Sequence, residues 1–383
     1  MKRIMFSVGE PSGELLACEI IKKIKKKSLE NIIFTGMGSE KMDSLGVNLV
    51  TDSTETAVVG FTEVFKKWFI LKNALKKLKN ELLKNPPNIL ILVDYVEFNL
   101  RLGQFAKTLG IPVLFYVSPQ IWAWGSDRVK RISNATDAIA LIFPFEIELY
   151  KKTKIRAKYV GHPLTEILPT SLNTETSKNE LSITTHDEII GLLPGSRISE
   201  LKQHLPVLKS TIIEINKTCK NVIFLLAVIN NKKHHILIKN FILELQSKNI
   251  NIKIFSDKTY EVISASNVVA VASGTAVLEV ALLKKPMIVF YKTSLISYLI
   301  LKTIITVDYI SLVNILLKKG SVEEFIQHDF NYKNLSKAII KLSKSKELQT
   351  NQIHDFETIR NILGNCSASD EVTKMIFEMT SKP

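Results

Sequence analysis

The chain has 383 residues, of which 46% are hydrophobic, and a formal net charge of +14 at pH 7. This length suffices for two domains with large buried cores, and the apolar content excludes an intrinsically disordered chain. The cysteines Cys18, Cys219 and Cys366 lie too far apart for a CxxC or zinc motif. Their spacing favours a reducing cytoplasm over a disulfide-stabilised secreted fold.

The positive charge indicates anionic partners: phosphorylated substrates, phospholipid headgroups or nucleic acid. Nucleic acid is the weakest of these, because the chain carries no RRM, zinc-finger or helix-turn-helix signature. We expect no secretory signal, since the first apolar run meets Gly9-Glu10-Pro11 too early. Lys292 and Lys302 interrupt the best candidate for a membrane span, so we expect a soluble or peripheral protein.

Short apolar strands alternate with helical patterns along the first half of the chain. Such alternation is typical of a parallel, doubly wound sheet, whose ligands bind at the carboxyl ends of its strands. We therefore expect an α/β, Rossmann-like domain over residues 1–168. Its strands are expected at Arg3–Val8, Ile32–Thr35, Ile89–Val93, Val113–Val117, Ala138–Ile142 and Ala157–Val160, with helices such as Gly13–Lys27, Thr62–Leu83 and Leu100–Leu109 between them.

The alternation repeats after a polar stretch, residues 169–188, which we interpret as a linker. A second Rossmann-like domain is expected over residues 189–354. Two such domains facing a central cleft suit a two-substrate reaction. The last helical pattern, residues 355–383, either packs back on the first domain or exchanges with a partner chain in a homodimer. Strands of the second domain are expected at Ile189–Leu193, Val222–Val228, Ile252–Phe255, Val268–Ala272 and Met287–Tyr291.

Two turns in the second domain have the residues of a diphosphate site. Ser273-Gly274-Thr275-Ala276 leads from a strand into a helix, where free N–H groups and the helix dipole can hold an anion. Glu279 is placed to accept hydrogen bonds from a ribose. Ser196 and Arg197 follow another strand of the same predicted sheet, and a guanidinium suits phosphate oxygens.

Each turn alone also fits an ordinary N-cap or reverse turn. Their place on one predicted sheet favours a donor nucleotide, and the absence of a P-loop motif argues against an NTPase.

Carboxylates follow two strands of the first domain. Asp94 and Glu97 come directly after one strand, and either could act as general base toward an acceptor hydroxyl. The alternative is a helix N-cap with a solvated Glu. The turn that contains Glu10, Ser12 and Gly13 suits sugar hydroxyls better than an anion.

The pattern of Thr62–Leu83 is that of a basic amphipathic helix with aromatic residues, which is typical of interfacial binding to anionic lipid. The alternative is a helix that only packs on its own sheet. We expect its Leu positions to lie inside and Phe65, Trp68 and Phe69 to face the bilayer. Tyr298, in the apolar segment Leu295–Ile305, is a second candidate for acyl contact.

A series of motifs resembles the lipid-A-disaccharide synthases over essentially the whole chain. The block at 118–124 is highly specific, whereas the two phosphate turns are shared more widely among glycosyltransferases of the GT-B type. The motifs are Gly9-Glu10-Pro11-Ser12-Gly13, Ser118-Pro119-Gln120-Ile121-Trp122-Ala123-Trp124, Val160-Gly161-His162-Pro163, Leu193-Pro194-Gly195-Ser196-Arg197, Ala272-Ser273-Gly274-Thr275-Ala276 and Asp308-Tyr309-Ile310-Ser311-Leu312-Val313-Asn314.

The resemblance implies a GT-B fold and a peripheral enzyme on the inner face of the cytoplasmic membrane. Its implied reaction joins UDP-2,3-diacylglucosamine to 2,3-diacylglucosamine 1-phosphate (lipid X). The products are a β(1→6) lipid A disaccharide 1-phosphate and UDP, with inversion at the anomeric carbon. Two other functions stay open: another UDP-sugar enzyme on this scaffold, such as an epimerase or peptidoglycan-precursor transferase, and a non-catalytic module that binds membrane lipid.

The resemblance also suggests roles for individual residues. Glu97 is the favoured base, with Asp94 as the alternative; His162 could compete, although a loop His before Pro is more often structural. Gln120 and Trp122 belong to the acceptor or sugar surface, with core packing an alternative for the tryptophan. Asn314 lies near the donor.

Three positions depart from the family pattern: Glu14 and Glu97 stand where Asp is usual, and Val313 where Pro is usual. A displaced base matters, because an error of about an ångström can cost a large factor in rate. The chain has no Asp-x-Asp motif, so we expect neither metal nor cofactor. Arg197 and the Ser273–Ala276 turn then stabilise the charge on departing UDP.

Overall fold

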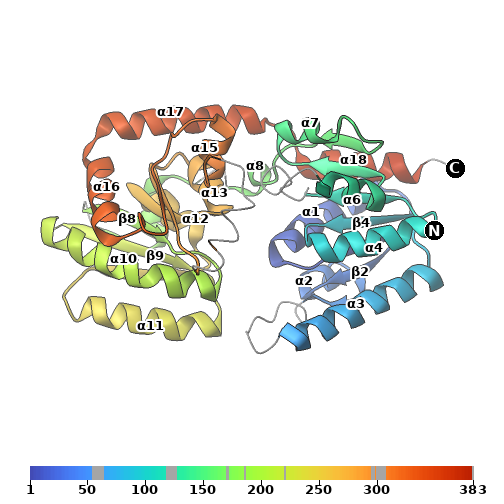
Figure 1. Cartoon of the computed structure of the whole chain (residues 1–383), viewed down its shortest axis with the longest axis horizontal. Coiled ribbons are helices and arrows are strands. Elements are labelled where there is room, and N and C mark those ends of the chain that lie inside the picture. Colours follow the sequence, from blue (N-terminus) through green and yellow to red (C-terminus); the bar gives the residue numbers. More distant parts are fainter. Residues whose placement is uncertain are drawn as a thin grey trace. The chain divides into compact units, whose positions relative to one another are not determined.

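The computed structural model describes residues 1–53, 64–117, 127–169, 172–184, 187–219, 221–294, 298 and 308–381. The chain forms two compact units (Figure 1). Unit 1 comprises Met1–Glu166 and Leu363–Pro383, and unit 2 comprises Ile167–Ile362. Each unit is built around one parallel sheet with interleaved helices, which confirms the predicted α/β fold class.

The sheet of unit 1 has the strand order β3-β2-β1-β4-β5-β6-β7, and its neighbouring strands pair in parallel. The edge strand β3 was not predicted, because its partly exposed sequence lacks an apolar run. The strands are β1 (Lys2–Val8), β2 (Ile32–Gly38), β3 (Val47–Asp52), β4 (Ile89–Val93), β5 (Val113–Tyr116), β6 (Ala138–Leu141) and β7 (Arg156–Tyr159).

Helices cover both faces of this sheet because alternate strand residues point to opposite sides. Ile4 and Phe6 pack against α1 and α18, whereas Met5 packs in the cluster formed with α3, α4 and α6. The helices of unit 1 are α1 (Pro11–Lys27), α2 (Glu40–Asp43), α3 (Val64–Lys84), α4 (Val96–Thr108), α6 (Asp127–Ala135), η3 (Pro144–Glu146), α7 (Ile147–Tyr150) and α18 (Ala368–Thr380), and α8 (Leu164–Ile167) lies at its boundary with unit 2.

The end of the chain belongs to unit 1, where α18 lies against α1 (Figure 1). Asp370 forms ion pairs of 2.7 Å with both Lys23 and Lys27. The Glu166 carboxylate accepts hydrogen bonds from the backbone N–H and the hydroxyl of Ser369, at 3.1 and 2.6 Å. Together with the buried side chains of α18, these contacts attach the last helix to the first part of the chain.

The sheet of unit 2 has the order β10-β9-β8-β11-β12-β13, and its neighbours are also parallel. Within the predicted linker, residues 174–180 form helix α9, which packs on α12. The strands are β8 (Glu188–Leu193), β9 (Val222–Val228), β10 (Ile252–Ser256), β11 (Val268–Ala272), β12 (Met287–Tyr291) and β13 (Glu324–Ile326). The helices are α9 (Thr174–Glu180), α10 (Ile198–Thr218), α11 (Lys232–Gln246), α12 (Thr259–Ala265), α13 (Ala276–Leu282), α15 (Leu312–Leu317), α16 (Tyr332–Lys344) and α17 (Lys346–Leu363).

Candidate functional site

Three neighbouring strands of unit 2 bring the predicted phosphate turns to one edge of the sheet. β11 lies between β8 and β12, and the three strands run in parallel. Their carboxyl ends therefore meet, which is where open α/β sheets bind ligands. The turn of Arg197 follows β8, the turn of Ser273 follows β11, and Lys292 follows β12.

The turn after β11 presents backbone donors at the start of α13. Gly274 and Thr275 are exposed, and the first intrahelical bond runs from the Val277 N–H to the Gly274 carbonyl at 3.2 Å. The N–H groups of residues 274–276 come before this bond, as at the start of any helix, so they are suited to an anion. The Ser273 hydroxyl instead donates to the Ile310 carbonyl at 2.9 Å. It ties the turn to the segment that precedes α15.

That segment is held by Glu324 and Asn314. The Glu324 carboxylate accepts from the backbone N–H groups of Ile310 and Ser311 at 2.9 and 3.0 Å. The buried Asn314 amide donates to Glu324 at 2.7 Å and to the Val322 carbonyl at 2.9 Å, so both of its hydrogens are used within unit 2. We interpret Asn314 as a residue that positions this segment, rather than as a direct donor to the nucleotide.

In the turn after β8, a glutamate occupies the place expected for phosphate. Glu200 Oε2 accepts from the backbone N–H groups of Ser196 and Arg197 at 3.0 and 3.2 Å. Gly195 is required here: its φ is +107°, and a Cβ would lie 2.4 Å from Glu200 Oε2. The Arg197 guanidinium contacts Glu200 Oε1 at 3.3 Å and remains 69% exposed. The side chain of Arg197, more than the backbone of Ser196, is therefore open to a ligand.

Two further residues at this edge were not predicted. His204 is buried and contacts the backbone of both Pro194 and Lys292. Lys292 is half-buried, and its charge is one of the influences that lower the pKa of His204, of which burial is the largest. A lone His in a helical pattern and a Lys after a strand are too common to be singled out from a sequence.

Glu279 sits in the first turn of α13 in an environment that favours its neutral form. Burial raises its pKa to about 7. The pKa of Tyr260 is raised to about 12, chiefly by burial and then by the charge of Glu279, so the two side chains are neighbours. Glu279 therefore offers both a donor and an acceptor for hydroxyl groups near neutral pH.

In unit 1, Asp94 lies on a strained turn at the end of β4, and Glu97 follows in the first turn of α4. Asp94 and Tyr95 both adopt left-handed conformations, with φ of 49° and 46°. The ring of Tyr95 lies against Gly9, where a Cβ would come within 2.1 Å of it. Buried Asn99 holds this turn through its amide, which donates to the carbonyl of Asp94 at 2.7 Å. Non-glycine residues in this conformation cost roughly 1–3 kcal/mol each and are concentrated at functional sites.

Glu97, the favoured base, lies in the first turn of α4 and is held by an arginine. Its two carboxylate oxygens accept from the guanidinium of Arg131 at 3.2 and 2.7 Å. Both side chains are more than a third exposed, at 57% for Glu97 and 50% for Arg131. The fork fixes the direction of the carboxylate, but at this exposure the ion pair adds little to stability.

The turn after β1 divides into exposed and structural residues. Glu10 and Ser12 are exposed, whereas Gly13 is buried, and a Cβ at this position would lie only 3.3 Å from the side chains of Val8 and Val93. Glu14 does not face a ligand: it is buried and accepts from the N–H and hydroxyl of Ser39, both at 2.6 Å.

His162 has the character of a structural residue. Its imidazole is buried, and burial lowers its pKa to about 4. Nδ1 accepts from the Leu164 backbone N–H at 3.2 Å, and the ring lies 5.1 Å from that of Phe143.

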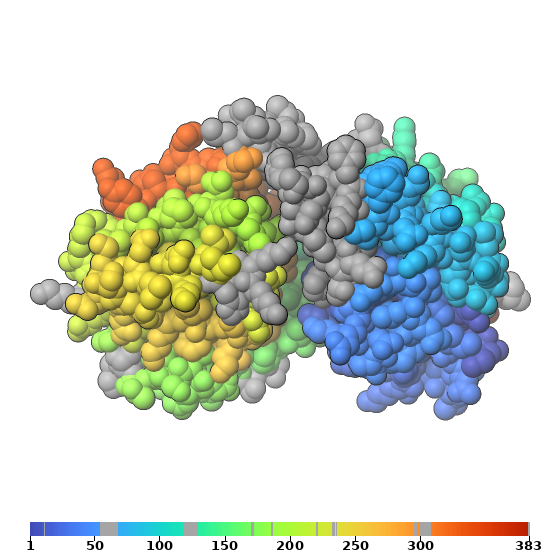
Figure 2. Space-filling view, turned by 90° about the horizontal axis from the view of Figure 1, so that it is seen from below, coloured from blue at the N-terminus to red at the C-terminus, as the bar shows by residue number. Residues whose placement is uncertain are grey.

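The amphipathic helix α3 lies on the surface of unit 1 (Figure 2). Leu78 and Leu82 are buried in the core, whereas Trp68 and Phe69 are 52% and 63% exposed. Their rings form a T-shaped pair at 5.1 Å, and the Lys72 ammonium lies 4.8 Å from the Trp68 ring. Gln120, Trp122 and the side chain of Phe65 lie outside the described residues. Tyr298 is half-buried, and its backbone N–H donates to the Ser294 carbonyl at 2.9 Å.

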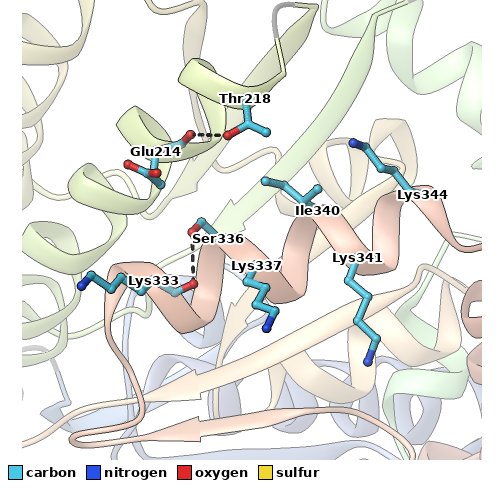
Figure 3. Close-up of a pocket in the computed structure, with 8 residues that line it drawn as sticks. All are labelled: Glu214, Thr218, Lys333, Ser336, Lys337, Ile340, Lys341 and Lys344. Atoms are coloured by element: carbon cyan, nitrogen blue, oxygen red, sulfur yellow. Dashed lines mark hydrogen bonds between the residues drawn. The ribbon is translucent and has the colours of Figure 1, made fainter.

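A basic groove of about 450 Å³ lies between α10 and α16 (Figure 3). Its walls include Glu214 and Thr218 from the last turns of α10 and four lysines of α16. α10 rises about 1.5 Å per residue, so Glu214 is roughly 25 Å along the helix from Arg197. The groove is therefore separate from the phosphate turns. Its lysines are Lys333, Lys337, Lys341 and Lys344.

Among the described residues, no cluster of His, Cys, Asp and Glu side chains is arranged to bind a metal ion. Across the same part of the chain, none of the helices has the length and apolar character needed to span a membrane.

Comparison with known proteins places these features in a family. The family model described as lipid-A-disaccharide synthetase matches residues 4–376. Lipid-A-disaccharide synthase 1 of Legionella pneumophila (strain Paris) is 35% identical over 96% of this chain and 94% of its own length. Lipid-A-disaccharide synthase of Sulfurihydrogenibium sp. is 35% identical over 100% and 99%. These findings confirm the resemblance found in the sequence.

Solved structures share the fold at much lower identity. UDP-GlcNAc 2-epimerase from Neisseria meningitidis, bound to UDP-GlcNAc, aligns with a TM-score of 0.67 at 13% identity, covering 99% of this chain and all of that one. MurG of Acinetobacter baumannii aligns with a TM-score of 0.60 at 13% identity, with the same coverage. Such likenesses show the GT-B fold alone.

Proposed function

We propose that this chain, which belongs to the lipid-A-disaccharide synthetase family, condenses UDP-2,3-diacylglucosamine with 2,3-diacylglucosamine 1-phosphate to lipid A disaccharide 1-phosphate and UDP. Membership makes it a glycosyltransferase of lipid A biosynthesis. One observation carries the proposal of these substrates: the match extends over residues 4–376, with relatives of that name at 35% identity along nearly the whole chain.

Unit 2 is proposed to bind the donor. The N–H groups of residues 274–276 and the guanidinium of Arg197 would hold the diphosphate, and Glu279 would contact the ribose. As the glycosidic bond to the departing UDP breaks, negative charge grows on the diphosphate. Fixed dipoles and cations stabilise that charge without having to reorganise.

Unit 1 is proposed to bind the acceptor and supply the base. The acceptor 6-hydroxyl attacks the anomeric carbon in line, and Glu97 takes its proton, with Asp94 as the alternative base. Glu10 and Ser12 are the exposed groups suited to sugar hydroxyls. The Arg131 fork would aim Glu97, and one displacement gives the inverted β-linkage.

Turnover of defined substrates tests the reaction. Purified protein is incubated with UDP-2,3-diacylglucosamine and 2,3-diacylglucosamine 1-phosphate, and disaccharide and UDP are measured. We expect the two products in equal amounts. A failure to form disaccharide would refute the proposal, and conversion of the UDP-sugar without acceptor would indicate an epimerase.

The base is tested by a pair of variants. Glu97→Gln keeps the size of the side chain but cannot take a proton, so we expect kcat to fall by about 10²–10⁴-fold with UDP affinity unchanged. Arg131→Ala is the matched comparison: it removes the same ion pair but leaves the carboxylate, so we expect a smaller fall in kcat than in Glu97→Gln. Near-full turnover by Glu97→Gln would move the role to Asp94, and Asp94→Asn would then abolish activity.

We also propose that the protein is peripheral on the inner face of the cytoplasmic membrane, with α3 at the lipid surface. Acylated substrates reside in membranes, and α3 combines exposed aromatic side chains with a basic side. Lys72, Lys76 and Lys77 are exposed beside Trp68 and Phe69, so the helix can contact acyl chains and anionic headgroups together.

Sedimentation with phosphatidylglycerol vesicles tests the membrane proposal. Replacing Trp68 and Phe69 together by Ser removes two large apolar side chains from the interface, and we expect binding to weaken at least about tenfold. Ile236 and Leu243 of α11 are similarly exposed, so the same double replacement there is the control. Equal binding by both double variants would contradict the assignment of α3.

A further inference from the structure

His204 links the two strands on either side of β11. It lies in the second turn of α10, fully buried, with Nδ1 2.7 Å from the Pro194 carbonyl. Nε2 lies 3.0 Å from the backbone N–H of Lys292. Pro194 directly follows β8 and Lys292 directly follows β12.

The partners of the imidazole fix where a neutral ring carries its hydrogen. The Pro194 carbonyl can only accept, so Nδ1 must carry a hydrogen and donate it. In a neutral ring Nε2 then has no hydrogen and accepts from the backbone N–H of Lys292, whereas the Lys292 carbonyl, 3.1 Å away, could bond to Nε2 only in the charged ring. The neutral form is also the one that burial favours, since burial lowers the pKa of His204. Each ring nitrogen therefore has a fixed role.

An aromatic cage fixes the plane of the ring. Phe290, Tyr291 and Phe330 meet the imidazole edge-on, with centroids 5.2, 5.5 and 5.6 Å away. Phe290 and Phe330 stack on each other at 4.6 Å. An apolar side chain would fill such a cage at less desolvation cost, so packing alone gives no reason for an imidazole here.

The two backbone segments that His204 joins carry cations on either side of the Ser273 turn. Arg197 lies three residues after Pro194, and Lys292 supplies both the N–H and its own ammonium. Burial raises the pKa of Tyr291, the charge of Glu200 raises it further, and the charge of Arg197 lowers it. Both charged side chains are therefore close to the end of β12.

We propose that His204 is a positioning residue for the donor diphosphate, which sets the spacing of Arg197 and Lys292 about the turn that follows β11. The inference rests on the proposed function, because it takes this edge of unit 2 as the donor site. Lys292 thereby becomes a second cation for the diphosphate. His204 itself does not contact the diphosphate. It acts through its hydrogen bonds to the backbone of Pro194 and Lys292, which carry the position of the two cations.

The test is UDP affinity, measured by calorimetry on the full chain. His204→Phe fills the cage and removes both hydrogen bonds, and we expect UDP to bind about tenfold more weakly. His204→Asn can restore only the bond to Pro194, because its amide nitrogen lies near the place of Nδ1, and we expect a loss of about threefold.

Phe330→Leu is the matched control. It removes an aromatic ring from the same cage and lowers the melting temperature, but it leaves both ties intact. We expect its UDP affinity to stay within about twofold of the parent's. Amide exchange at Lys292 gives a second readout: its protection should fall in His204→Phe and persist in Phe330→Leu.

The outcomes separate the inference from the proposed function. Equal UDP affinities for the parent and His204→Phe would overturn the inference, as would equal losses in His204→Phe and Phe330→Leu. If His204→Phe does not fold, His204→Asn decides, and parent-like affinity in that variant overturns the inference. A parent protein that binds no UDP refutes the proposed function itself, and the inference with it.

Discussion

Replacing Asn99 by Ala should destabilise unit 1 and inactivate the enzyme together. Asn99 Oδ1 accepts from the Ser7 hydroxyl at 2.6 Å, and its amide nitrogen lies within 3.2 Å of the carbonyls of Ser7, Val93 and Asp94. The side chain thus joins the end of β1 to the end of β4. Asn99 is fully buried, so water could replace these bonds only by entering the small space that the removed amide leaves.

The expected loss of stability follows from the number of hydrogen bonds that Asn99 can make at one time. The amide has two hydrogens, so it makes two bonds at a time, and the Ser7 hydroxyl supplies a third. At about 1 kcal/mol net for each bond, the free energy of unfolding should fall by about 3 kcal/mol. Without this tie, the left-handed Asp94 and Tyr95 would relax, and the start of α4 would move with them.

Urea denaturation followed by tryptophan fluorescence measures this loss in the right unit. The chain's three tryptophans, at 68, 122 and 124, all belong to unit 1. Thr136→Val is the control: it removes one buried hydrogen bond, to Ile132, and should cost about 1 kcal/mol with activity retained. A loss below about 1 kcal/mol for Asn99→Ala, or full turnover despite a larger loss, would refute the reasoning.

Two other features of unit 1 give predictions. Burial raises the pKa of Glu146 to about 8 from its ordinary value of 4.5, so the unfolded chain ionises first as pH rises. The free energy of unfolding then falls between these values by on the order of 1 kcal/mol per pH unit. Glu146→Gln should flatten this part of the melting profile from pH 5 to 8, and an unchanged slope would contradict it. Glu166→Ala removes the acceptor for both donors of Ser369, so limited proteolysis should cleave near α18 faster; an unchanged rate would mean that α18 is held by packing alone.

The fold was predictable where burial was complete, and two of the four edge strands were missed. β4 and β11 are buried at every position, so each appears in the sequence as an unbroken apolar run. β3 and β13 lie at sheet edges, and their residues are mostly half-exposed, which leaves little apolar signal. α9 was missed for a similar reason, because its seven residues are almost all polar.

The candidate site was predictable in its turns and not in its supports. Ser273 and Arg197 follow buried strands of one predicted parallel sheet, and the carboxyl ends of such strands are where ligands bind, so the two turns together favoured a ligand site. His204 acts through a contact with distant backbone, because it reaches Lys292 across 88 residues of sequence. Such contacts exist only once the strand order is known, and periodicity carries no information about them.

Glu14 and Glu97 show how neighbouring contacts can accommodate a longer side chain than the family pattern has. Glu14 and Glu97 each add a methylene, about 1.5 Å of reach, where the family usually has Asp. The longer Glu14 ends on both donors of Ser39, and the longer Glu97 ends in the fork of Arg131. Each extra methylene thus comes with a fixed partner at its far end. The position of the Glu97 carboxylate is therefore set jointly by α4 and by Arg131 on α6, so the length of the side chain alone does not determine whether this base is in place.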